Sequence, residues 1–202
     1  MARRENPIKE IREKQIKQAA LRLFSERGFH NTTITQIAEA AELGKGTIYW
    51  YWRSKEDLAY SLVSDMLRDF LALIEEARNA EGPVLERFND LVSKVAELYY
   101  RETDYLRLLW KFRVDRGYIF SEEYRDKVAS YYLRMRQALE SLIEEGIEKG
   151  EFRKVDSKRM AFILIGVTEG LELEWLENED EFSMRDALRE VMEMALISLR
   201  KE

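Results

Sequence analysis

The residue types best suited to contact another molecule lie in one short stretch of the chain. Positions 45–52 read Lys-Gly-Thr-Ile-Tyr-Trp-Tyr-Trp, which places four aromatic side chains in a row. If the stretch is helical, Ile48 and Trp52 share one face and Trp50 lies on the opposite one. A DNA major groove offers phosphates to hydroxyl groups and thymine methyls to apolar rings. We therefore interpret Tyr49 and Trp50 as DNA-contacting residues. The alternative is that all four rings are core, which is disfavoured because one helix face cannot bury consecutive residues.

Composition excludes several kinds of catalytic site. The sequence has no cysteine and a single histidine, His30, so it lacks disulfides, thiolate nucleophiles and metal sites built from several histidines. It also contains neither a nucleophile–base arrangement nor a glycine-rich phosphate loop. We therefore expect a protein that is not an enzyme, with no catalytic residue, no metal site and no cofactor.

Three predicted helices position the aromatic stretch. Apolar residues recur at helical spacing over 16–24, and Gly28 ends this first helix. Thr33 and Gln36 form a capping box for a second, shorter helix, and the stretch after Gly44 forms the third. Two short helices about a glycine turn, flanked by long helices, are typical of a helix-turn-helix.

Charge is distributed unevenly along the chain. Residues 1–53 contain ten basic and six acidic side chains, whereas the remainder contains 23 basic and 33 acidic ones. A basic end on an acidic body fits a protein that presents one end to a polyanion, because phosphate attraction acts locally. The alternative is that these charges form solvated helix faces.

The rest of the sequence also predicts helices. Only two prolines and nine glycines occur in 202 residues, and no segment alternates as a half-buried strand does. The longest apolar run, 160–167, is far shorter than the roughly 18 residues that a membrane span needs. We therefore expect an all-α, cytoplasmic protein of about nine helices with no membrane partner.

Four motifs mark the first third of the chain. They are G-F-x-x-T-T at 28–33, I-A-x-x-A at 37–41, G-T-I-Y at 46–49 and S-K-E-D-L at 54–58. In these motifs the stretch 16–58 resembles the DNA-binding domain of the TetR family of transcriptional regulators. The resemblance implies that the recognition helix contains Lys45, Gly46, Thr47, Tyr49, Trp50 and Tyr51, that Thr33 and Thr35 contact the DNA backbone, and that Lys55 binds a phosphate.

Two details of this region differ from the motifs or lie outside them. Gly46 departs from relatives that carry a side chain at this position, so base contacts there would come from Lys45, Thr47 and the backbone. Arg3 and Arg4 either form an arm that reaches a minor groove or make no contact.

The resemblance also implies two domains, a helix-turn-helix domain over 1–53 and a helical ligand-binding and dimerisation domain over 54–202. Apolar stripes in the last two predicted helices either build a four-helix bundle with a second subunit or form core within one chain. The predicted interface residues are Ile163, Val167, Gly170, Leu171, Leu188, Val191 and Ala195. A homodimer would present two recognition helices to a palindromic operator in double-stranded DNA.

A small-molecule ligand is the least defined expectation. Aromatic residues with polar tips gather in the middle helices, where they either line a pocket for an apolar molecule or form ordinary core. The candidate ligand-binding residues are Tyr99, Tyr105, Trp110 and Tyr131. The resemblance implies a repressor that a small molecule releases from its operator. The alternative is a DNA-bound dimer that acts mainly through protein partners, without a small-molecule inducer.

Overall fold

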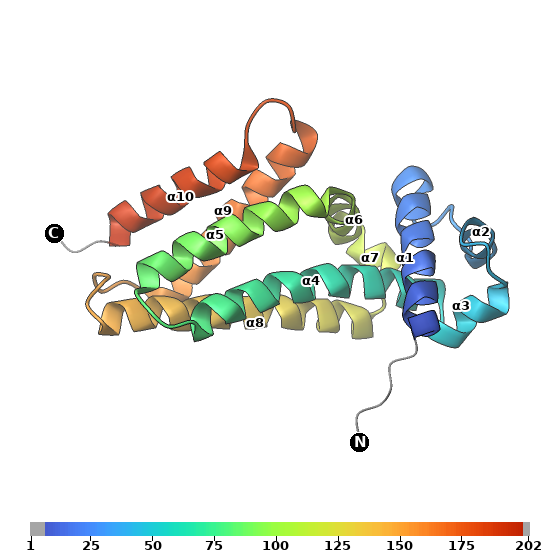
Figure 1. Cartoon of the computed structure of the whole chain (residues 1–202), viewed down its shortest axis with the longest axis horizontal. Helices are drawn as coiled ribbons and strands as arrows, with labels where there is room; N and C mark the ends of the chain where they lie inside the picture. Colours follow the sequence, from blue (N-terminus) through green and yellow to red (C-terminus); the bar gives the residue numbers. More distant parts are fainter. Residues whose placement is uncertain (1–6, 200–202) are drawn as a thin grey trace, which may run out of the picture. The chain divides into compact units, whose positions relative to one another are not determined.

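The fold is all-α, as the sequence predicts. The computed structural model describes residues 7–199, in which ten helices and no β-strand occur (Figure 1). The helices are α1 (Pro7–Arg27), α2 (Ile34–Ala40), α3 (Lys45–Tyr51), α4 (Lys55–Asn79), α5 (Val84–Arg101), α6 (Thr103–Val114), α7 (Arg116–Ile119), α8 (Glu122–Glu148), α9 (Ser157–Glu177) and α10 (Met184–Leu199). The one helix beyond the expected number is α7, a single turn that forms around Gly117.

The described residues form two compact units. The N-terminal unit contains residues 7–66 and 104–126, and the C-terminal unit contains residues 67–103 and 127–199. The first part of α4 thus belongs to the N-terminal unit and its second part to the C-terminal unit. The predicted functional boundary between residues 53 and 54 stays a prediction, because compactness does not report which residues bind DNA.

The core of the N-terminal unit fixes α1, α2 and α3 against each other. Its fully buried side chains include Ile16, Phe24, Ile37, Ile48 and Leu58, which come from four helices. Burying side chains of this size contributes about 1.5–3 kcal/mol each relative to exposure. The short helices α2 and α3 are too short to be stable alone, so this packing holds them in place.

Local signals explain where α2 begins. The Thr33 backbone N–H donates to Gln36 Oε1 at 2.8 Å, and the Gln36 N–H donates to Thr33 Oγ1 at 3.2 Å. These bonds form the predicted capping box, which satisfies two backbone donors at the start of the helix. The capping prediction is therefore confirmed.

The turn between α2 and α3 differs from the predicted glycine turn. Gly44 has φ −71° and caps α3, whereas Glu42 has φ 54°, in the left-handed region. This conformation is costly for a residue with a Cβ. The Leu43 N–H donates to the Ala38 carbonyl at 2.9 Å, which closes the turn around Glu42.

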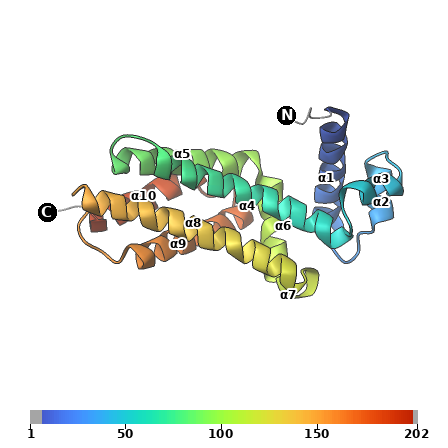
Figure 2. The same cartoon turned by 90° about the horizontal axis from the view of Figure 1, so that it is seen from below.

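The C-terminal unit is built from long helices. Helix α10 packs on α5 and α9 (Figure 1), and the second part of α4 lies beside α8 (Figure 2), where Arg134 forms an ion pair with Glu75 at 3.0 Å. A Cβ added at Gly146 would lie 2.3 Å from the Phe152 ring, so α8 needs glycine there for the following segment to pack closely.

Candidate nucleic-acid interface

Helix α3 has one buried face and one exposed face. Ile48 is 0% and Trp52 6% exposed, whereas Tyr49 is 48% and Trp50 68% exposed. The burial pattern therefore agrees with the spacing argument from the sequence. Two large rings with polar tips are thus exposed to solvent. Exposed apolar area of this kind is commonly covered by a binding partner.

Two lysines flank the exposed rings. Lys45 Nζ lies 5.9 Å from the centre of the Tyr49 ring, and Lys9 Nζ lies 5.5 Å from the centre of the Trp50 ring. Lys45 begins α3, whereas Lys9 belongs to the first turns of α1, and both are exposed. The surface therefore combines exposed aromatic rings with ammonium groups, which are the two kinds of side chain that contact bases and phosphates in nucleic-acid complexes.

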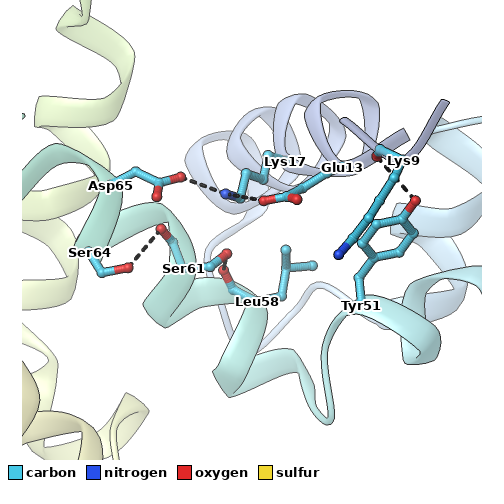
Figure 3. A network of polar contacts seen from close by, with 8 residues as sticks. All are labelled: Lys9, Glu13, Lys17, Tyr51, Leu58, Ser61, Ser64 and Asp65. Carbon is cyan, nitrogen blue, oxygen red and sulfur yellow. Dashed lines mark hydrogen bonds and ion pairs between the residues drawn. The ribbon is translucent and has the colours of Figure 1, made fainter. Parts of the chain in front are cut away.

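Tyr51 faces α1 and is half-buried. Its hydroxyl donates to the Lys9 carbonyl at 3.1 Å (Figure 3). Its ring meets the Trp50 ring edge-to-face at a centroid distance of 4.7 Å. The predicted DNA contact by Tyr51 stays untested, but its hydroxyl proton already has a partner in this structure.

The remaining predicted DNA-contacting residues of α2 and α3 are accessible. Thr33 and Thr35 are exposed at the start of α2, Gly46 is exposed in the first turn of α3, and Thr47 is half-buried. No atom lies within 4 Å of a Cβ added at Gly46, so glycine is not required there for packing. Arg3 and Arg4 lie outside the described residues.

Lys55 has a structural role that the sequence did not reveal. Its ammonium donates to the Phe29 carbonyl at 2.6 Å and to the Thr32 carbonyl at 2.8 Å, and it lies 4.2 Å from the Phe29 ring centre. Burial lowers the pKa of Lys55. Two of its three N–H donors thus tie α4 to the segment between α1 and α2, which leaves one for a phosphate.

Lys17 connects α1 to α4 and lies near the C-cap residue of α3 in the N-terminal unit. Its ammonium lies 2.8 Å from Glu13 and 2.6 Å from Asp65 of α4 (Figure 3). It also lies 6.0 Å from the Trp52 ring centre. Burial alone would lower the pKa of Lys17, but the hydrogen bonds to Asp65 and Glu13 outweigh it and raise the pKa. This contact could not be predicted from sequence patterns, because Lys17 and Asp65 are 48 positions apart.

The predicted ligand-binding residues belong to different units. Tyr99 is buried and Tyr131 half-buried in the C-terminal unit, whereas Tyr105 and Trp110 are half-buried in the N-terminal unit. Around Tyr99 lie Phe70 and Trp175, at ring distances of 5.5 and 6.5 Å. Burial raises the pKa of Tyr99 well above 10.0, and the charge of Glu172 and a hydrogen bond to it raise it further.

The predicted interface residues differ in accessibility. Ile163, Val167 and Gly170 are exposed on α9, and Leu171, Val191 and Ala195 are half-buried. Leu188 is buried within the chain, because it lies on the inner face of α10, so it offers no surface to a second copy. The exposed part of the predicted interface therefore lies mainly on α9.

None of the described helices has the length and apolar character to cross a membrane. No cluster of histidine and acidic side chains in residues 7–199 is arranged to hold a metal ion.

The fold and this surface define a helix-turn-helix transcriptional regulator. Residues 16–62 match the family model for bacterial regulatory proteins of the tetR family, and residues 81–199 match the model for the tetracyclin repressor-like C-terminal domain. Because the second match alone spans more than half of the sequence, the chain belongs to the TetR family. It is thus a DNA-binding transcriptional regulator.

Individual relatives agree with this assignment. The chain is 23% identical over 189 residues to the fatty acid metabolism regulator protein of Bacillus subtilis. The aligned residues cover 93% of this chain and 95% of that relative. The fatty acid degradation regulator FadR of Bacillus halodurans has a TM-score of 0.77 at 24% identity, covering 99% of this chain and 100% of that one. FadR of Bacillus subtilis, solved with stearoyl-CoA, has a TM-score of 0.75 at 22% identity, covering 92% of this chain and 98% of that one. These relatives are regulators, in agreement with the expectation that the chain is not an enzyme.

Proposed function

We propose that this protein is a homodimeric repressor that binds a palindromic operator and leaves it when a small molecule binds. The proposed DNA contact rests on the exposure of Tyr49 and Trp50. Ile48 and Trp52, on the opposite side, are buried. Lys45 and Thr47 adjoin these rings, and Thr33, Thr35 and Lys55 supply backbone contacts around them.

An apolar strip on α9 supports a homodimer. Phe162 is 53%, Ile163 49% and Val167 40% exposed, and Gly166 and Gly170 are exposed beside them. Small residues one turn apart let a second helix approach closely, and an isologous contact would double the buried apolar area. Two copies related by a two-fold axis present two α3 helices to two half-sites of one operator.

A long-chain acyl thioester is the first ligand that we propose. The support is the solved relative that holds stearoyl-CoA, together with the apolar and aromatic core of the C-terminal unit around Tyr99. Binding there would lower operator affinity through α4, which is one continuous helix with residues in both units. A coupling of about 1.4 kcal/mol would change that affinity about tenfold.

In vitro selection from a random duplex library tests the DNA contact. Wild-type protein should enrich a palindromic sequence, and the double variant Tyr49→Ala, Trp50→Ala should lose at least about a hundredfold in affinity for the enriched duplex. Ser93→Ala, an exposed residue of α5 outside the proposed DNA and dimer surfaces, is the control for handling and folding. Full affinity in the double variant, with an unchanged melting curve, would contradict the assignment of α3.

A thermal-shift series tests the ligand. Acyl-CoA compounds of increasing chain length should raise the melting temperature progressively, whereas CoA alone should not, because the gain comes from buried methylenes. The same compounds should release the selected duplex. A shift that is equal for CoA and stearoyl-CoA would exclude recognition of the acyl chain.

A further inference from the structure

Two contacts join the first turns of α1 to the end of α3, and a ring contact within α3 links them. The Tyr51 hydroxyl donates to the Lys9 carbonyl at 3.1 Å, the Tyr51 ring meets the Trp50 ring at 4.7 Å, and Lys9 Nζ lies 5.5 Å from the Trp50 ring centre. Figure 3 shows Tyr51 of α3 pointing toward Lys9 of α1. Tyr51 and Lys9, which are 42 positions apart in the sequence, thus lie together at one edge of the surface formed by Tyr49 and Trp50.

This arrangement places a positive charge where α3 alone has none. Lys45 is the basic residue of α3, and it lies at the beginning of the helix beside Tyr49. The exposed ring at the other side of the surface, Trp50, is accompanied by Lys9 instead. A base-contacting ring in a major groove has phosphates on both sides, so a cation beside each ring matches the charge distribution of the duplex.

The position of Lys9 depends on a hydrogen bond that Tyr51 makes to the backbone. Lys9 itself is exposed, and its long side chain has considerable rotamer freedom in solution. The bond from Tyr51 fixes the turn that carries Lys9, and the Trp50 ring gives its ammonium a preferred location. Preorganisation of this kind lowers the entropic cost of binding.

We propose that Lys9 is a phosphate-contacting residue of the operator complex and that Tyr51 is a positioning residue that holds Lys9 beside Trp50. Tyr51 then acts through Lys9 rather than by touching the DNA with its hydroxyl. The inference rests on the proposed DNA contact through α3, and it extends the DNA-binding surface to α1.

The test of Lys9 is the salt dependence of affinity for the duplex selected by the wild-type protein. Lys9→Met keeps the aliphatic stem and removes one charge, so the slope of log K against log salt should become shallower by about one for each subunit that loses a phosphate contact. The loss should be similar for selected and scrambled duplexes, and Lys9→Arg should restore the slope. Lys14→Met, which removes an exposed lysine from the same helix, is the matched control and should leave the slope unchanged.

A double-mutant cycle tests Tyr51. Tyr51→Phe should weaken binding several-fold in the wild type and much less in the Lys9→Met background, because both changes act through one contact. An equal loss in both backgrounds would show that the Tyr51 hydroxyl contacts DNA directly and would overturn its positioning role. Equal slopes for Lys9→Met and Lys14→Met would overturn the role of Lys9.

The proposed function is tested separately in the same titration. If Trp50→Ala binds as tightly as the wild type, the α3 contact itself is wrong. If Trp50→Ala fails to bind while Lys9→Met matches the wild type, only the extension to α1 is wrong.

Discussion

The exposed apolar surfaces of α3 and α9 differ in chemistry. On α3 the exposed side chains are a tyrosine and a tryptophan, and a lysine ammonium lies within 6 Å of the centre of each ring. On α9 they are Phe162, Ile163, Val167 and Leu173, beside two exposed glycines, and the Arg136 guanidinium lies 4.7 Å from the centre of the Phe162 ring. Rings with polar tips suit a hydrated polyanion, whereas apolar side chains without polar tips, beside glycines, suit close packing against another helix. The polar tips of the rings, rather than exposure or a neighbouring cation, thus distinguish the proposed DNA surface from the proposed dimer surface.

Salt should separate the two surfaces most strongly. Raising the salt concentration from about 50 mM to about 200 mM should weaken operator binding on the order of a thousandfold, because several phosphate contacts release counterions. Dimerisation through α9 should change only a few-fold over the same range, since it buries apolar area. Fluorescence anisotropy of labelled duplex and sedimentation equilibrium measure the two affinities. Similar salt dependence of both would contradict the comparison.

A charge placed on α9 should disrupt the dimer. Val167→Arg should raise the dimer dissociation constant by about a hundredfold or more, because it buries an unpaired cation in the contact. Light scattering after size exclusion reports the mass. Leu133→Arg, which changes an exposed apolar residue of α8, is the matched control and should remain dimeric. A dimeric Val167→Arg variant would move the interface away from α9.

The support beneath α3 should depend on Lys17. Lys17→Met removes the part-buried ion pair with Asp65 and should cost about 1 kcal/mol in the free energy of unfolding. Because the pKa of Lys17 is raised in the folded state, this contribution is complete below the ordinary value of 10.5 and is lost as pH rises through the raised value. Urea melts of both proteins between about pH 8 and pH 11 measure the difference, which should shrink only at the alkaline end. A difference that shrinks toward neutral pH instead would contradict the ion pair.

Relieving the turn before α3 should have the smallest effect. Glu42→Gly should stabilise the protein by about 0.5 kcal/mol, because glycine adopts the left-handed conformation seen at φ 54° without a Cβ clash. Operator affinity should not change, since Glu42 is not among the residues proposed to contact DNA. Glu39→Gly makes the same replacement inside α2 and should destabilise by about 1 kcal/mol. Equal effects of the two variants would show that the conformation of Glu42 is not strained.

The parts of the fold that depend on neighbouring residues were predictable from the sequence. The Thr33–Gln36 capping box and the burial of Ile48 and Trp52 follow from spacings of three and four residues. The exposure of Tyr49 and Trp50 follows in turn from that burial. The structure confirms these features. They were predictable because each depends only on residues about one helix turn apart.

Contacts between distant residues were not predictable in this way. The bonds from Lys55 to the Phe29 and Thr32 carbonyls and from Lys17 to Asp65 join residues 23 to 48 positions apart, and lysines on helices commonly remain in solvent. The left-handed Glu42 was missed because the glycine two residues later, at position 44, was the stronger turn signal. Helix α7 was missed because a single turn has no periodicity to detect.

Gly46 leaves vacant space at the start of the recognition helix. A mutation that adds a side chain there meets no neighbouring atom, and a residue that is not glycine is also easier to accommodate in a helix. In the proposed operator complex, new side chains at this position would change the groups presented to the major groove at little cost to folding. Single substitutions at position 46 would then alter operator preference without any need for compensating mutations in the core.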